Sequence, residues 1–76
     1  MSKFRFKAEM RVTRIVNERP HTCTFHTKHT TFALAEARLI KDIALRKSEG
    51  NQVHWARIVQ LGGEHLSDWT AGEVAV

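Results

Sequence analysis

The chain lacks several features that mark common classes of protein. Cys23 is its only cysteine, so no internal disulfide can form, and the small secreted scaffolds that depend on several disulfides are excluded. The longest purely apolar run is Phe32–Ala35, which is far too short to span a membrane. No apolar segment follows the N-terminal cations, so we expect no signal peptide. These absences predict a soluble, cytoplasmic protein.

Size and charge narrow the classes further. A chain of 76 residues with 42% hydrophobic and 26% charged residues is typical of one small folded domain, and such a domain has little room for a deep substrate cleft. We therefore expect a non-enzymatic protein. Residues 1–50 carry eleven Lys and Arg against five Asp and Glu, whereas residues 51–76 carry one Arg against three acids. A basic body of this kind suits a polyanionic partner, an acidic protein surface, or simple solubility.

The first twelve residues alternate between apolar and charged side chains. The even positions are apolar: Phe4, Phe6, Ala8, Met10 and Val12. The odd positions are charged: Lys3, Arg5, Lys7, Glu9 and Arg11. A period of two predicts a strand, running to about Val16, with one buried and one solvated face. The solvated face carries four cations and one anion, and it is the strongest functional clue in the chain.

A second strand is predicted from about His21 to His29, after a turn at residues 17–20 in which Pro20 ends the pairing. Its threonines suit a half-exposed pleated surface. The inward side chains are expected to be Cys23, Phe25 and Thr27. The outward side chains are expected to be Thr22, Thr24, His26 and Lys28.

A helix is predicted to begin after Thr30 or Thr31, either of which can cap it, and to stop at Gly50 and Asn51. Its core-facing stripe is expected to contain Phe32, Ala33, Ala37, Leu39, Ile40, Ile43 and Ala44. Leu34 and Leu45 fall outside this stripe, beside Arg38 and Lys41. Two explanations stay open: the chain termini cover these leucines, or they form a contact patch with a cationic rim.

The C-terminal part of the chain predicts a hairpin. One strand covers about Val53 to Leu61, turns at Gly62 and Gly63, and returns through Glu64 to about Thr70. The predicted fold is therefore α+β, a single ββαββ domain over residues 1–70 with one helix packed on one face of an antiparallel sheet. Residues 71–76 are expected to be a frayed tail. Trp55 is predicted to lie in the core, and Trp69 in the core or at an interface.

The segment from His21 to His29 contains the densest group of potential metal ligands. His21 and Cys23 share one face of the predicted strand, whereas His26 points away. Two further ligands would have to come from His54 or His65, and no paired ligand spacing is present. We therefore expect no metal and no cofactor, and keep a zinc-stabilised domain around His21 and Cys23 as the third hypothesis. The chain also lacks a nucleophile elbow and a phosphate-binding glycine loop.

The basic outer face of the first strand resembles a surface that tracks phosphates, because long cations lie beside the small hydroxyls of the neighbouring strand. The phenylalanines point inward, so this face is expected to lack aromatic residues and not to stack on single-stranded bases. A solvated face that serves solubility is the alternative.

One resemblance is carried by the ββαββ order and by two stretches, Ala35-Glu36-Ala37 in the helix and Val53-His54-Trp55-Ala56-Arg57-Ile58 in the following strand. The chain resembles small phage-encoded proteins that bind and disable host machinery, the anti-CRISPR proteins among them. The resemblance covers about half of the chain and transfers no functional residues. It implies stoichiometric binding to a nucleic-acid-handling complex in the host cytoplasm.

The sequence thus supports two main hypotheses. In the first, the protein occupies a surface of a larger protein or protein–nucleic acid complex. In the second, the same basic face binds nucleic acid directly. The residues expected to make contact are Lys3, Arg5, Lys7, Arg11, Lys28, Arg38, Lys41 and Trp69. No membrane partner is expected, and no residue pattern indicates an oligomeric state.

Overall fold

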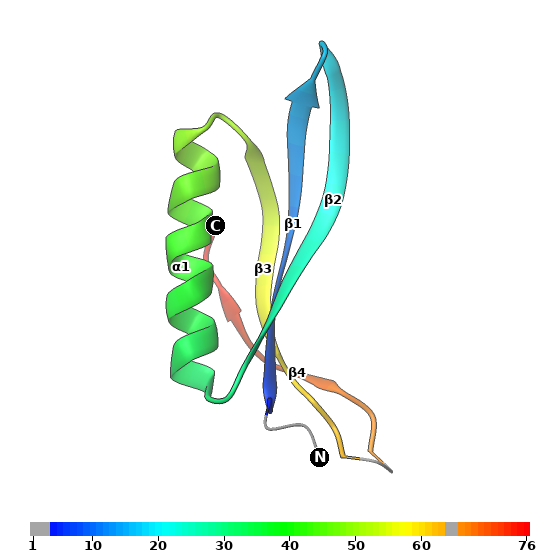
Figure 1. Cartoon of the computed structure of the whole chain (residues 1–76), viewed down its shortest axis with the longest axis vertical. Coiled ribbons are helices and arrows are strands. Elements are labelled where there is room, and N and C mark those ends of the chain that lie inside the picture. The colour runs from blue at the N-terminus through cyan, green and yellow to red at the C-terminus, as the bar shows by residue number, and fades with distance from the viewer. Residues whose placement is uncertain (1–3, 64–65) are drawn as a thin grey trace.

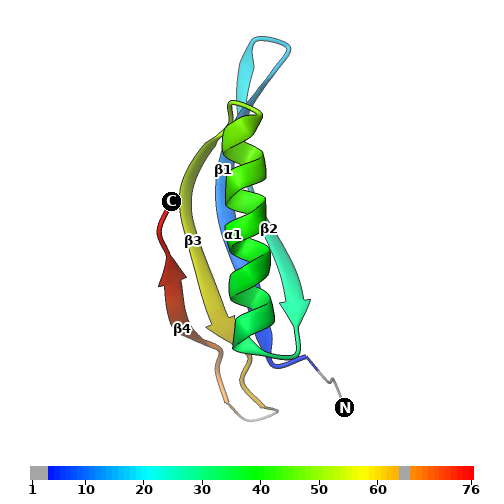
Figure 2. The same ribbon diagram turned by 90° about the vertical axis from the view of Figure 1, so that its left-hand side faces the viewer.

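The chain forms one four-stranded sheet with a helix on one side, as a computed structural model shows for residues 4–63 and 66–76 (Figure 1). The elements follow in the order β1 (Phe6–Val16), β2 (Arg19–His29), α1 (Phe32–Ser48), β3 (Gln52–Gln60) and β4 (Trp69–Val74). The strands lie side by side as β2-β1-β3-β4, and each neighbouring pair is antiparallel. Figure 2 shows α1 lying across β1 on one face of the sheet. The predicted ββαββ fold is therefore confirmed.

The hydrophobic core lies between α1 and the sheet face that it covers. Its buried apolar residues come from β1, α1 and β3: Ala8, Met10, Val12, Ala35, Leu39, Ile43, Val53, Ala56 and Ile58. The even-numbered residues of β1 from Phe6 to Val12 face the helix, as the alternation predicted. Phe4, expected at the start of this row, is 42% exposed.

The buried stripe of α1 is narrower than predicted and lies to one side of the predicted arc. Its buried residues are Ala35, Leu39 and Ile43. Five members of the predicted stripe are exposed: Phe32, Ala33, Ala37, Ile40 and Ala44. Spacing shows that a helix has a wide apolar arc, but it does not show which part of the arc meets the sheet. Leu34 and Leu45 are 54% and 49% exposed, so the described part of the chain termini does not cover them.

Side chains at both ends of α1 stabilise it. The Thr31 hydroxyl accepts a hydrogen bond from the Leu34 N–H at 3.2 Å, which identifies Thr31 as the N-cap. Gly50 has a φ of 82°, the left-handed conformation expected for the residue that stops the helix. In the last turn, the Arg46 guanidinium lies 4.9 Å from the centre of the Phe25 ring on β2, so it fastens this end of the helix to the sheet.

The turn between β1 and β2 is shorter than predicted. Asn17 and Glu18 have φ values of 52° and 64°, and positive φ at two central residues is what a type I′ hairpin turn requires. The expectation that Pro20 ends the pairing is wrong, because Pro20 pairs with Ile15 inside β2. β2 is an edge strand, and an edge strand tolerates a residue that has no N–H.

The fourth strand lies further along the chain than predicted, at Trp69–Val74 rather than between Glu64 and Thr70. The backbone closes tightly before it: the Gly62 N–H donates to Asp68 Oδ1 at 2.8 Å. A Cβ at Gly62 would lie only 2.1 Å from the Leu66 carbonyl oxygen, so a side chain there would displace the loop. Glu64 and His65, which the predicted hairpin included, lie outside the described residues.

Candidate functional site

The sheet face opposite α1, here called the open face, carries charged, hydroxyl and aromatic side chains from neighbouring strands. β1 contributes Lys7, Glu9, Arg11 and Thr13 to it, because these alternate with the core residues of the same strand. Register brings residues of the neighbouring strands beside them: Lys28, His26, Thr24 and Thr22 on β2, and Val59, Arg57 and Trp55 on β3. Glu73 of β4 is opposite Arg57. The Lys and Arg side chains named here outnumber the two glutamates by two.

Glu9 organises the middle of the open face. Glu9 is only 8% exposed. Its carboxylate accepts a hydrogen bond from Lys7 Nζ at 2.9 Å and another from Arg57 Nε at 2.7 Å. A buried carboxylate needs such partners to offset the loss of water. The free positive charge of the face is therefore smaller than the sequence suggested, because Lys7 and Arg57 are partly neutralised.

The pKa of Glu9 reflects two opposing effects. Burial alone would raise the pKa of this carboxyl group, but the hydrogen bonds from Lys7 and Arg57, together with their positive charges, hold it below its ordinary value of 4.5. Glu9 is therefore ionised at neutral pH and acts as the anchor for two cations.

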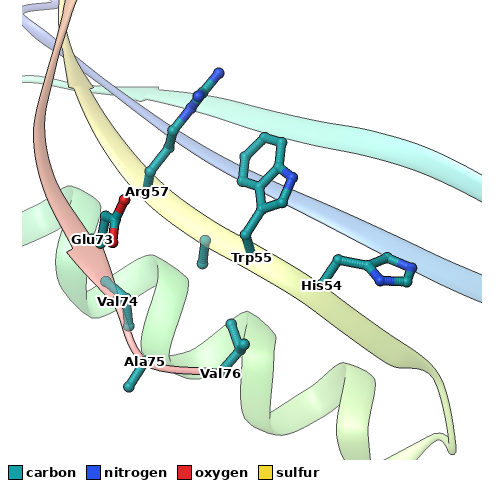
Figure 3. A pocket seen from close by; sticks show the side chains of 8 residues that line it. His54, Trp55, Arg57, Glu73, Val74, Ala75 and Val76 are labelled. Atoms are coloured by element: carbon teal, nitrogen blue, oxygen red, sulfur yellow. The ribbon is translucent and has the colours of Figure 1, made fainter.

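Trp55 also lies on the open face, and the prediction that it belongs to the core is wrong. The pairing of β1 with β3 shifts by one residue between Arg11 and Val12, so Val53 is buried in the core while Trp55 pairs with Arg11 on the other face. The Arg57 guanidinium lies 4.6 Å from the centre of the Trp55 ring. Figure 3 shows both side chains rising from the same side of β3. The open face thus carries an aromatic residue, contrary to the expectation that it lacks one.

A row of hydrogen-bonded polar groups continues the open face beyond Trp55. The Thr13 hydroxyl lies 2.6 Å from the Thr22 hydroxyl and 2.6 Å from Nε2 of His54. One row before it, Arg11 Nη1 donates to the Thr24 hydroxyl at 3.4 Å. These contacts hold hydroxyl and imidazole groups beside the cations, where a phosphate or a base edge could accept or donate hydrogen bonds.

A pocket of about 470 Å³ adjoins Trp55, at the place where β3 continues beyond the end of β4. β4 pairs with β3 only over Ala56–Gln60. The pocket is lined by His54, Trp55, Ala56, Arg57, Glu73, Val74, Ala75 and Val76 (Figure 3). Its walls combine an indole, a guanidinium and a carboxylate, which are groups that recognise a planar polar ligand.

The structure does not gather the predicted contact residues on one surface. Arg11 and Lys28 lie on the open face with Lys7; Arg5 is exposed just before β1; Lys3 lies outside the described residues. Arg38 and Lys41 are on α1, on the other side of the molecule, and Arg38 Nε donates to Asp42 at 2.8 Å. Trp69 is 46% exposed and pairs with Gln60 at the start of β4, so it is remote from Trp55 along β3.

The potential metal ligands do not gather in the described part of the chain, where no three His, Cys, Asp or Glu side chains form a metal-binding group. Cys23 pairs with Val12 on the covered face, whereas His54 contacts Thr13 on the open face, so these two side chains cannot share an ion. His29 is held by the Thr27 hydroxyl at 2.7 Å. His65 lies outside the described residues.

Comparisons of the chain with protein-family models, with curated proteins and with solved structures found no match. Within the described residues, α1 falls short of the length and apolar character that a bilayer-spanning helix requires.

Proposed function

We propose that this protein is a non-enzymatic module that binds single-stranded nucleic acid on the open face of its sheet. The observation that carries the proposal is the position of Trp55, which lies half-buried on that face. The Arg57 guanidinium stacks on its ring, and Arg11 is its partner on β1. Single-strand binding combines a positive surface that follows the backbone with aromatic groups on which bases stack. Both components occur here on one exposed surface.

Each group on the open face has a role in this proposal. A base stacks on the Trp55–Arg57 pair, since indole and guanidinium are both planar groups that bases stack on. Arg11 and Lys28 contact phosphates, and the hydroxyls of Thr22 and Thr24 position the backbone by hydrogen bonds. Glu9 holds Arg57 in place and, being buried, presents little negative charge to the ligand.

The test is fluorescence anisotropy with labelled single-stranded and duplex DNA and RNA, repeated across a salt series. Wild-type protein should bind the single strands, with log Kd rising linearly with log salt, by about 0.7 for each phosphate contacted. Trp55→Ala should weaken this binding by about 1–3 kcal/mol, the usual contribution of one stacked base. Trp55→Phe, which retains an aromatic ring, should recover most of the affinity.

Lys41→Ala is the matched control, because it removes one positive charge from the opposite side of the molecule. If Lys41→Ala weakens binding as much as Arg11→Ala does, attraction is non-specific and the open face is not the site. Absence of binding to every probe at low salt would contradict the proposal altogether.

A second candidate is binding to the surface of a protein or protein–nucleic acid complex, the mode of action implied by the resemblance to small phage-encoded inhibitors. The outer side of α1 favours it. Leu34, Ile40 and Leu45 are 54%, 55% and 49% exposed, and Lys41 lies among them. Apolar residues with a cationic rim are a composition that protein interfaces use.

A further inference from the structure

The β1–β2 hairpin extends beyond the rest of the sheet. β1 pairs with β3 only as far as Thr13, whereas its pairing with β2 continues to Val16. Residues 14–21 therefore form a two-stranded ribbon, here called the hairpin arm, which projects past the end of α1 (Figures 1 and 2). The tight turn at its tip, with positive φ at both Asn17 and Glu18, joins the two strands without a long loop.

The two sides of the hairpin arm differ in chemistry. Ile15 and Pro20 pair directly with each other and extend the row of the open face beyond Thr13 and Thr22. Ile15 is 67% exposed. On the opposite side, Arg14 pairs with His21 and Arg19 with Val16. An apolar pair thus ends the open face, with two arginines behind it.

We propose that the hairpin arm recognises the junction between single-stranded and duplex nucleic acid, with Ile15 and Pro20 packing on the terminal base pair. This inference rests on the proposed function, since the single strand beyond the junction would run over the open face. A terminal base pair presents a flat apolar surface, and Ile and Pro are among the residues that proteins use as wedges against base steps. Arg14 and Arg19 then contact the duplex phosphates.

Charge and spacing both favour this partner over a protein surface. Within residues 14–21, Glu18 is the one acid against two arginines, so the arm is complementary to an anionic partner. Ile15 lies four residues along β1 from Arg11, the partner of Trp55, which corresponds to about 13 Å at a strand rise of ~3.3 Å per residue. That distance matches about four nucleotides at ~3.4 Å each. A strand stacked on Trp55 therefore reaches the arm within a few nucleotides.

The experiment compares three labelled DNA probes by anisotropy: a single strand, a blunt duplex, and the same duplex with a single-stranded overhang. We expect the overhang duplex to bind at least about fivefold tighter than the single strand. Ile15→Thr keeps a β-branched side chain but replaces its ethyl group by a hydroxyl. It should remove most of this preference while leaving single-strand binding within about twofold. Ile15→Val, which stays apolar, should retain the preference. Circular dichroism would verify that each variant is folded.

The outcomes separate this inference from the proposed function. If wild-type protein binds the single strand and the overhang duplex equally, the junction is not recognised, but single-strand binding stands. If the blunt duplex binds as tightly as the overhang duplex, the arm does not read a junction. If Ile15→Thr keeps the full preference, Ile15 does not pack on the terminal base pair. If no probe binds, the proposed function itself fails and this inference fails with it.

Discussion

The two sides of β1 carry different kinds of side chain. Toward α1 it presents Ala8, Met10 and Val12, each at most 2% exposed; toward the open face it presents charged and hydroxyl side chains around Glu9. The covered face is stabilised by apolar burial, which is non-directional and proportional to area. The open face instead depends on specific hydrogen bonds and ion pairs. Substitutions should therefore affect stability mainly on the covered face and binding mainly on the open one.

The largest effect on stability should come from Ile58, which is fully buried in β3 on the covered face. Ile58→Ala should lower the free energy of unfolding by about 2–5 kcal/mol, because it leaves a cavity that the small core fills only partly. Urea denaturation measures this directly. If Ile58→Ala is unfolded, Ile58→Val should still show a loss of about 0.5–1.5 kcal/mol.

Ile15→Ala is the control for Ile58, since Ile15 has the same side chain on the exposed hairpin arm. It should change stability by no more than about 0.5 kcal/mol. Equal losses at the two positions would refute the assignment of the core to the covered face.

An intermediate effect is expected at Glu9, a buried residue through which the open face also supports the fold. Glu9→Gln should lower stability at pH 7 by about 1–2 kcal/mol, because Lys7 and Arg57 lose their charged acceptor. The pKa of Glu9 is lowered in the folded protein, so its contribution is fully present above its unfolded pKa and is lost as pH falls through the folded pKa. The urea midpoints of wild type and variant should therefore differ at pH 7 and converge in the acid range.

Glu73→Gln provides the comparison for Glu9. Glu73 is exposed on β4, opposite Arg57. An ion pair that involves a solvated carboxylate contributes little to the free energy of unfolding. Substitution of Glu73 should leave the stability at pH 7 nearly unchanged. A loss as large as that of Glu9→Gln would show that the buried ion pairs are not the source of the effect.

The smallest effect on stability is expected on the outer side of α1. Leu45→Ser should change the free energy of unfolding by no more than about 0.5 kcal/mol, since Leu45 is 49% exposed. It should also leave nucleic-acid binding unchanged. Affinity capture with wild-type, Leu45→Ser and Trp55→Ala proteins sharpens the contrast: a partner lost only from Leu45→Ser would favour the second candidate function, and a partner lost only from Trp55→Ala would favour the open face.

Local patterns predicted most of the fold. Alternation in residues 4–12 identified β1 and assigned its two faces, and threonine-rich alternation did the same for β2. The apolar arc and the Thr31 and Gly50 signals located α1. The predicted frayed tail begins at residue 71, whereas β4 extends to Val74. β4 was harder to place because its residues alternate weakly, and because its connection to β3, from Gln60 to Trp69, is longer than the predicted turn at Gly62 and Gly63.

The sequence by itself determined the ββαββ order and the two chemistries of β1, because strand and helix periods are local properties of the chain. Only the tertiary structure decided how the open face is composed. A one-residue shift in the pairing of β1 with β3 moved Trp55 from the expected core to the surface, because the side-chain period is two and one extra residue reverses the face. The same pairing brought Arg57 to Glu9, 48 residues away in the sequence, and no local pattern specifies such a contact.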